Sequence, residues 1–170
     1  ASRADLKASY RLLGCEDVSY EQVIRQHVLM TRKECEEQGE FLLLQDTTIL
    51  DFSTHPMTEG LGRIGNDRGY GMLLHTALAV RVESWNVQDG VTTSMVGLAG
   101  QMCWTRQGDA KRQVESRMDR LRRHRESMCW TEVLQDMGRA PMGMKWTVIG
   151  DRGADLYELF EYCQAQDLQF

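Results

Sequence analysis

The run Phe41-Leu42-Leu43-Leu44-Gln45-Asp46-Thr47-Thr48 begins with bulky apolar residues and ends with a carboxylate followed by threonines. Consecutive apolar residues of this kind predict a strand that is buried on both faces, in the middle of a sheet covered by helices. An ionised Asp46 where that strand emerges is costly unless a cation or hydrogen-bond donors compensate its charge. The run Trp146-Thr147-Val148-Ile149-Gly150-Asp151 repeats the pattern. We therefore expect two core strands that each end in an aspartate.

Length and composition indicate one domain, or a large part of one. The chain has 170 residues and a formal net charge of −5, which argues mildly against nucleic-acid binding. The chain contains no apolar run of about 18 residues, so no membrane-spanning helix is predicted. The first residues lack the features of a signal peptide. The 5 cysteines, without a CxxC pair, predict reduced thiols in a cytosolic protein. Both ends look cut, and residues 168–170 are typical of the opening of a further strand.

Periodicity and turn signals predict the remaining elements. A helix over 3–13 is followed by a second helix that begins with a capping box at Ser19 and ends before Gly39. A long loop from about Thr47 to Gly69 leads to an antiparallel hairpin of strands 70–82 and 92–105, turned at Asp89-Gly90. Helical patterns then lie within 109–137 and over 154–164, on either side of the Asp151 strand.

A glycine-rich stretch and two histidines have possible functional interpretations as well as structural ones. Residues 60–65 match the pattern G-x-G-x-x-G, but they neither follow a strand directly nor open a helix, so we discard a dinucleotide site. We interpret His27 and His75 as hydrogen-bonded core histidines. The more specific alternative is that His75 lies near the Asp46 site.

Positive charge is concentrated in one stretch, between positions 111 and 125. The simplest interpretation of this stretch is a solvated face of a helix. The functional interpretation is a DNA-binding surface. The stretch contains Lys111, Arg112, Arg117, Arg120, Arg122, Arg123 and Arg125, against only Glu115 and Asp119.

The order of elements brings the two aspartates together in the predicted sheet. A helix between the third and fourth strands allows the fourth to pair parallel to the first. Asp46 and Asp151 then lie at the carboxyl ends of neighbouring parallel strands, where open α/β sheets place their sites. Paired carboxylates repel unless a divalent cation lies between them, and an all-oxygen site suits Mg²⁺ or Mn²⁺. Such ions serve phosphoryl transfer. The alternative is that each aspartate caps a turn.

Several spaced motifs together resemble one family over nearly the whole chain. The chain resembles the catalytic core of bacterial cut-and-paste DDE transposases of the insertion-sequence-four type, the group of the transposon-five transposase. The motifs are Leu6-Lys7-Ala8-Ser9-Tyr10-Arg11, Leu44-Gln45-Asp46-Thr47-Thr48, Gly60-Leu61-Gly62-Arg63-Ile64-Gly65, Leu73-Leu74-His75-Thr76-Ala77-Leu78-Ala79-Val80, Arg125-Glu126-Ser127 followed by Trp130, and Gly150-Asp151-Arg152-Gly153-Ala154-Asp155-Leu156-Tyr157-Glu158-Leu159.

The resemblance implies an α/β, RNase H-like fold. Its mixed sheet would have an antiparallel three-strand meander and a parallel fourth strand, with helices packed on the sheet. Residues 1–40 would be a helical lead-in, the end of an N-terminal DNA-binding region. Residues 41–170 would be the first part of the catalytic core, truncated before the third catalytic carboxylate.

The resemblance also implies a DNA strand-cleavage and strand-transfer activity. Asp46 and Asp151 match the first two catalytic, metal-binding aspartates of the family, which uses two Mg²⁺ (or Mn²⁺) ions. Arg152 matches a phosphate contact, and Gly153 replaces the family's glutamate. Glu158 and Glu161 come too early to be the third carboxylate, so this chain alone is expected to be inactive.

The resemblance further implies partners and a location. DNA, as transposon ends and target, would be the partner, contacted by Arg152 and by a basic set within positions 111–123. A homodimer would form in the full-length protein, in the bacterial cytoplasm with the nucleoid and without a membrane. A catalytically inactive, transposase-derived DNA-binding or interaction module is the alternative, and a stand-alone nuclease lacks a third acidic candidate. The basic set is Lys111, Arg112, Arg120, Arg122 and Arg123.

Overall fold

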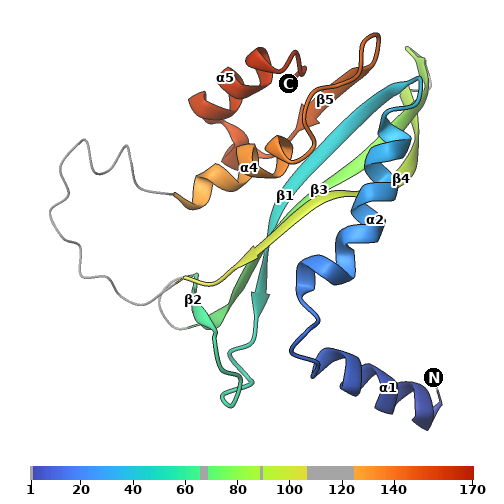
Figure 1. Ribbon diagram of the computed structural model, residues 1–170. Helices are drawn as coiled ribbons and strands as arrows, with labels where there is room; N and C mark the ends of the chain where they lie inside the picture. The colour runs from blue at the N-terminus through green and yellow to red at the C-terminus, as the bar shows by residue number, and fades with distance from the viewer. Residues whose placement is uncertain (1, 66–68, 89, 107–124) are drawn as a thin grey trace, which may run out of the picture.

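The computed structural model describes residues 2–65, 69–88, 90–106 and 125–170. Its centre is a mixed sheet of five strands with helices packed against it (Figure 1). The strands are β1 (Glu40–Asp51), β2 (Gly62–Ile64), β3 (Gly69–Asn86), β4 (Gly90–Trp104) and β5 (Lys145–Ile149). The helices are α1 (Arg3–Leu13), α2 (Tyr20–Cys35), α4 (Cys129–Gln135) and α5 (Tyr157–Ala165), with short 3₁₀ helices η1 (Glu126–Met128) and η2 (Arg152–Ala154).

The pairing of the strands agrees with the α/β arrangement expected from the sequence. β1 pairs antiparallel with β3, which pairs antiparallel with β4 and with the short β2. β5 pairs parallel with β1, on the side away from β3. The hairpin between β3 and β4 is confirmed by the pairing of Asn86 with Gly90, although Asp89 of the predicted turn lies outside the described residues.

The end of the chain extends the sheet beyond β5. Gln169 forms a parallel bridge with Thr147. The N–H of Val148 donates to the carbonyl of Gln169 at 2.7 Å, and the N–H of Gln169 donates to the carbonyl of Trp146 at 3.0 Å. These bonds agree with the expectation that residues 168–170 open a further strand.

The first strand differs from its prediction in two ways. One face of β1 is fully covered, with Phe41 and Leu43 buried, whereas Leu42 on the other face is only half-buried. The prediction that this strand is buried on both faces was therefore wrong. The strand also continues past Asp46 to Asp51, because its ladder with β3 extends over the whole length of β1. Backbone pairing, rather than apolar content, sets the length of this strand.

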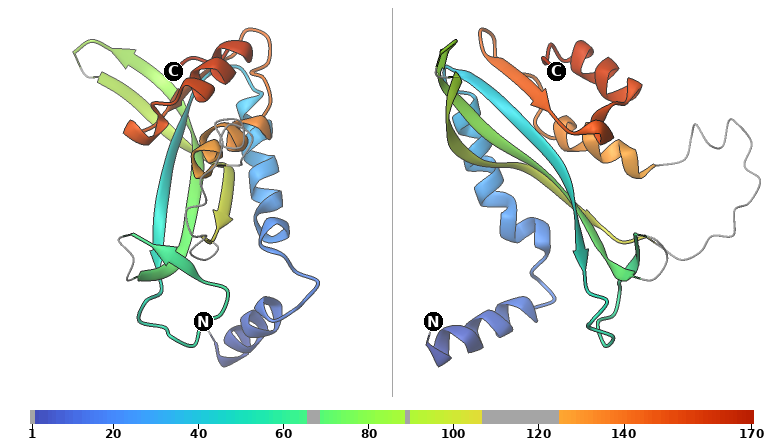
Figure 2. Two further views of the ribbon diagram at one scale, coloured as in Figure 1. Left: turned by 90° about the vertical axis from the view of Figure 1, so that its left-hand side faces the viewer. Right: turned by 180° about the vertical axis from the view of Figure 1, so that it is seen from behind.

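The covered face of the sheet carries the main core. Helices α4 and α5 lie over this face (Figures 1 and 2). Their apolar stripes predicted from the sequence are confirmed by burial of Trp130, Leu134, Leu159 and Cys163. All five cysteines of the chain are free thiols. No helix in the described part of the chain is long and apolar enough to cross a membrane.

Helix α2 covers the outer edge of β4. His27 Nε2 accepts a hydrogen bond from the N–H of Leu98 at 3.0 Å, and Arg32 Nε donates to the carbonyl of Ala99 at 3.1 Å. These side chains satisfy backbone groups that an edge strand leaves unpaired. His27 is therefore hydrogen-bonded as predicted, but it is exposed rather than part of the core.

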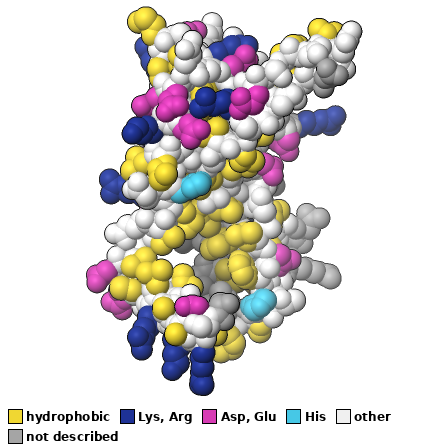
Figure 3. All heavy atoms as spheres, turned by 90° about the vertical axis from the view of Figure 1, so that its right-hand side faces the viewer, with side chains coloured by type: hydrophobic (Ala, Val, Ile, Leu, Met, Phe, Trp, Pro, Cys, Tyr) yellow, Lys and Arg dark blue, Asp and Glu magenta, His cyan; other side chains and the backbone are white. Residues whose placement is uncertain are grey.

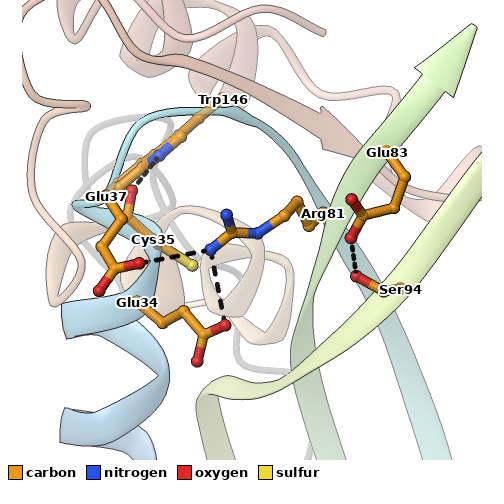
Figure 4. Close-up of polar contacts among 7 residues, drawn as sticks. All are labelled: Glu34, Cys35, Glu37, Arg81, Glu83, Ser94 and Trp146. Atoms are coloured by element: carbon orange, nitrogen blue, oxygen red, sulfur yellow. Dashed lines mark hydrogen bonds and ion pairs between the residues drawn. The ribbon is translucent and has the colours of Figure 1, made fainter.

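The C-terminal end of α2 is tied to β3 and β5 (Figure 4). Arg81 of β3 forms ion pairs with Glu34 at 3.5 Å and with Glu37 at 3.9 Å. On the other side, the indole N–H of Trp146 donates to the carbonyl of Cys35 at 3.1 Å, in the buried core. The end of α2 therefore spans three strands and fixes the amino-terminal half of β1 between them.

Candidate functional site

The parallel register of β1 and β5 relates the two predicted catalytic aspartates. The paired residues end with Leu44 opposite Ile149. Asp46 and Asp151 each lie two residues past this last pair, Asp46 within β1 and Asp151 in the turn that follows β5. Both side chains are exposed to solvent.

Asp151 already has a structural role in its own turn. It is the N-cap residue of η2, and its Oδ1 accepts a hydrogen bond from the N–H of Gly153 at 2.7 Å. The capping alternative considered from the sequence is thus present at Asp151. Arg152 follows within η2 and is exposed, which leaves its guanidinium open to a partner in solution.

Trp130 supports the turn that carries Asp151. A Cβ atom at Gly150 would lie 2.6 Å from Trp130 Cζ3, and a Cβ at Gly153 would lie 3.1 Å from Trp130 Cζ2. The indole is 5 % exposed, so the ring fills the space beneath both glycines. The close approach of this turn to α4 needs glycine at position 150, whereas the contact of a Cβ at position 153 with the indole would only be tight.

His75 also contacts Trp130, edge to face, and belongs to a buried polar network. Its Nδ1 lies 2.7 Å from Thr47 Oγ1, and its Nε2 lies 2.9 Å from Gln45 Oε1. Because the amide oxygen of Gln45 only accepts, Nε2 carries the proton and Nδ1 accepts from the threonine hydroxyl. Burial lowers the pKa of His75 to about 4, against an opposing effect of the Asp46 charge. His75 is therefore neutral, as expected of a core histidine.

Asp46 and His75 lie on opposite faces of the sheet. Asp46 is directly opposite Thr76 in the antiparallel pair of β1 and β3, whereas His75 is opposite Thr47. Opposed residues point to the same face and successive residues to alternate faces. His75 therefore supports the strand from the core side and does not contribute a group to the face that carries Asp46.

The face that carries Asp46 has its own polar chain. Gln101 Nε2 of β4 donates to Thr76 Oγ1 at 2.8 Å, and the hydroxyl of Tyr20 at the start of α2 donates to Gln101 Oε1. Burial raises the pKa of Tyr20, so this hydroxyl stays protonated. The chain links the start of α2 to the position opposite Asp46.

The nearby glutamates are engaged in ion pairs. Arg106 forms two hydrogen bonds with Glu126, at 2.7 and 2.8 Å, which hold the pKa of Glu126 below its usual range. Arg125 forms an ion pair with Glu158, which lowers the pKa of that carboxyl in the same way. Arg125 and Glu158 also line a pocket of about 270 Å³ between η1, α4 and α5. Glu158 thus has a structural partner, consistent with its rejection as a third ligand.

The structure describes some of the residues predicted to bind metal or DNA, but not all of them. Among residues 2–65, 69–88, 90–106 and 125–170, no group of three or more His, Cys, Asp or Glu side chains could hold a metal ion. The basic residues predicted to contact DNA lie outside the described residues. They are Lys111, Arg112, Arg120, Arg122 and Arg123, together with Arg117.

The G-x-G-x-x-G stretch has a structural explanation. It forms β2, a short strand against β3, rather than a turn into a helix. A Cβ at Gly62 would lie 2.3 Å from the carbonyl oxygen of Arg106, so the backbones are in contact there. Gly60 and Gly65 have φ angles of 77° and 57°, which favour glycine. These contacts support discarding the dinucleotide interpretation.

No known protein-family model matches this chain.

The sequence interpretation missed how the site is supported. Trp130 was singled out as a core residue of a helix, but its contact with the Asp151 turn depends on how α4 sits on the sheet. Gln45 and Thr47 flank Asp46 at alternating positions, and that alternation was the one available signal for a polar network on the opposite face.

Proposed function

We propose that this chain is the first part of the RNase H-like catalytic core of a DDE transposase, which cleaves DNA and transfers the cut strand. The observation that supports it best is the parallel pairing of β1 with β5, which sets Asp46 and Asp151 at equivalent positions two residues past the last pair. Carboxylates at equivalent positions of adjacent parallel strands are the arrangement that a shared cation needs.

The two aspartates fit a hard divalent cation. Their ligand atoms are carboxylate oxygens, which suit Mg²⁺ or Mn²⁺, and both side chains are exposed, so a hydrated ion reaches them. Oδ1 of Asp151 accepts the hydrogen bond of its turn, and Oδ2 would coordinate the cation. When bound, the cation would neutralise charge on a phosphodiester as a water, and later a 3′ hydroxyl, attacks it.

The chain's own residues would then hold and orient the DNA. Asp46 and Asp151 would hold the cation at the end of the β1 and β5 pairing, and Arg152 would donate to a phosphate oxygen of the DNA. A third carboxylate belongs to the family's site and has no counterpart among these residues. We therefore expect this chain by itself to bind metal weakly and to cleave DNA poorly.

Calorimetric titration with Mn²⁺ tests the proposal. The wild type is compared with Asp46→Asn, which removes a charge at the site, and with Asp136→Asn, which removes one from the exposed end of α4. We expect binding heat for the wild type and for Asp136→Asn, and its loss for Asp46→Asn. Equal heats for the wild type and Asp46→Asn would overturn the metal-site proposal.

A DNA-binding or interaction module without catalysis is the second candidate. It is favoured by the hydrogen bond from Gly153 N–H to Asp151 Oδ1, since this bond accounts for Asp151 without a metal. The basic stretch between positions 111 and 125 would then carry the activity. DNA affinity that falls steeply with salt and is unchanged in Asp46→Asn, together with no Mn²⁺ heat, would favour this candidate.

A further inference from the structure

The loop between β1 and β2 forms a pocket of about 470 Å³. Its wall contains the rings of Phe52, His55 and Tyr70, and its polar groups include Ser53 and Thr58. A pocket of this size, with aromatic walls and a few polar groups, is typical of sites for small planar ligands. The loop includes part of the glycine-rich stretch that the dinucleotide interpretation failed to explain.

The pocket opens from the same face of the sheet as Asp46. Thr76 lies opposite Asp46, and Tyr70 lies six positions before Thr76 in β3. An even separation along a strand keeps side chains on one face, and six residues span about 20 Å. Figure 3 views the molecule from the side on which α2 lies in Figure 1 and shows hydrophobic side chains gathered over the middle and lower part of that face. A few nucleotides of one strand cover the distance between Asp46 and Tyr70.

The pocket offers rings for stacking, with a cation beside them. The guanidinium carbon of Arg63 lies 4.8 Å from the centroid of the Tyr70 ring. The Phe52 and His55 rings meet edge to face, with centroids 6.2 Å apart. Aromatic rings with a neighbouring arginine are the platforms on which unpaired bases stack in proteins that bind single strands. Tyr70 is 45 % exposed, so the ring is open to such a partner.

The acidic groups of this region disfavour a pocket built for phosphate. The carboxylate of Asp51 accepts hydrogen bonds from the N–H of Ser53, at 2.8 Å, and from its hydroxyl, which lower the pKa of Asp51. That carboxylate stays ionised beside the pocket, and Glu59 lies in the same loop. These negative charges disfavour a phosphate group inside the pocket, whereas a base inside the pocket has no net charge to repel.

We propose that the pocket between Phe52 and Tyr70 takes an unpaired nucleobase of a DNA strand whose phosphodiester lies at Asp46 and Asp151. The strand would run along the exposed face of β1 and β3, with the base held by stacking. This inference rests on the proposed DNA-processing function and adds to it a preference for an unpaired base a few nucleotides away from the reacting phosphate.

Single-strand binding without metal tests the pocket. Fluorescence anisotropy with a short labelled single-stranded oligonucleotide, in the presence of EDTA, compares Tyr70→Ala and Tyr70→Phe with the wild type. We expect Tyr70→Ala to weaken binding about tenfold and Tyr70→Phe, which keeps the ring, to stay within about twofold. The matched control is Tyr157→Ala on α5, where a 75 % exposed tyrosine is removed far along the chain from the pocket. Equal affinities of Tyr70→Ala and the wild type would overturn the proposal.

Photocrosslinking of the wild type provides a readout that does not depend on the folding of a variant. An oligonucleotide with 5-iododeoxyuridine is irradiated in the complex, and the crosslinked peptides are identified by mass spectrometry. Crosslinks at Phe52, His55 or Tyr70 support the pocket, and crosslinks confined to other segments overturn it. Failure of the wild type to bind the single strand also overturns it. The Mn²⁺ titration of Asp46→Asn still judges the proposed function separately, because the pocket is tested without metal.

Discussion

The indole ring of Trp130 meets the imidazole of His75 edge to face, with 4.6 Å between ring centroids and 67° between ring planes. A Cβ atom at Gly150 would lie 2.6 Å from the same indole, and a Cβ atom at Gly153 would lie 3.1 Å from it. One core side chain therefore connects the polar network beneath β1 with the turn that carries Asp151. We expect substitutions at Trp130 or His75 to affect the structure of both segments that carry the aspartates.

Replacing Trp130 tests how strongly this stack holds the fold. Trp130→Ala removes a side chain that is 5 % exposed, and we expect it to lower the free energy of unfolding by about 3–5 kcal/mol. Trp130→Phe keeps a ring against His75 and should cost less. Urea denaturation followed by circular dichroism measures both. A loss below about 1 kcal/mol for Trp130→Ala would contradict the packing described here.

The glycines of the Asp151 turn predict an order of destabilisation. A Cβ at Gly150 would lie 2.6 Å from both Ala154 Cβ and Trp130 Cζ3, whereas the closest contact at Gly153 would be 2.9 Å, to Asp151 Oδ1. We expect Gly150→Ala to cost about 1–3 kcal/mol, and Gly153→Ala to cost less. Combining Gly150→Ala with Trp130→Leu should recover part of the loss. The same cost in both Trp130 backgrounds would show that the indole is not the obstacle.

Stability should fall in acid because His75 is buried and neutral. Its pKa is lowered from 6.5 to about 4, so the unfolded chain binds a proton between these values that the folded chain does not. The contribution is fully present above pH 6.5 and is lost as pH falls toward 4. Between pH 7 and pH 5 we expect a loss of roughly 2 kcal/mol from this residue.

Thermal and urea unfolding of His75→Gln at both pH values isolates that contribution. The difference between pH 7 and pH 5 should shrink relative to the wild type, because the titrating group is gone. His55→Gln, in an exposed loop, is the matched control for the loss of a histidine. An unaltered dependence in His75→Gln would mean that other groups account for the acid sensitivity.

Two substitutions at Asp151 separate capping from metal binding. Asp151→Asn keeps an oxygen that can accept from the N–H of Gly153, so stability should change little. Asp151→Ala removes the acceptor and should cost about 1 kcal/mol. Both should lose Mn²⁺ heat in calorimetry if Asp151 is a ligand. Retained heat in Asp151→Asn would leave capping as the only role of this carboxylate.

The ion pair between Arg106 and Glu126 should contribute modestly and depend on salt. Its two hydrogen bonds are short, but the side chains are 39 % and 44 % exposed. A double-mutant cycle with Arg106→Gln and Glu126→Gln should give a coupling of about 0.5–1 kcal/mol at low salt. The coupling should decrease in about 1 M salt, since screening is then stronger. A coupling that is insensitive to salt would argue for a hydrogen-bond rather than a charge effect.

The local features of the fold were predictable from the sequence because they depend on neighbouring residues. The capping box at Ser19 predicted the start of α2, and the apolar run from Phe41 predicted β1. The helical stripes predicted that Trp130 and Leu159 are buried. Each signal comes from the period of side chains along a helix or strand, which the chain carries without its partners.

Tertiary structure decided the features that depend on partners. β1 continues past Asp46 because β3 pairs with it as far as Asp51, and no local signal marks that ladder. The half-buried second face of β1 and the exposure of His27 follow from where the helices settle on the sheet. The sequence by itself determined where β1, β3, β4 and β5 lie along the chain and placed Asp46 in the first of these strands and Asp151 at the end of the last. Only the packed sheet determined the parallel register of β1 with β5 and the packing of the Asp151 turn against Trp130, because both arise from contacts between segments far apart in the chain.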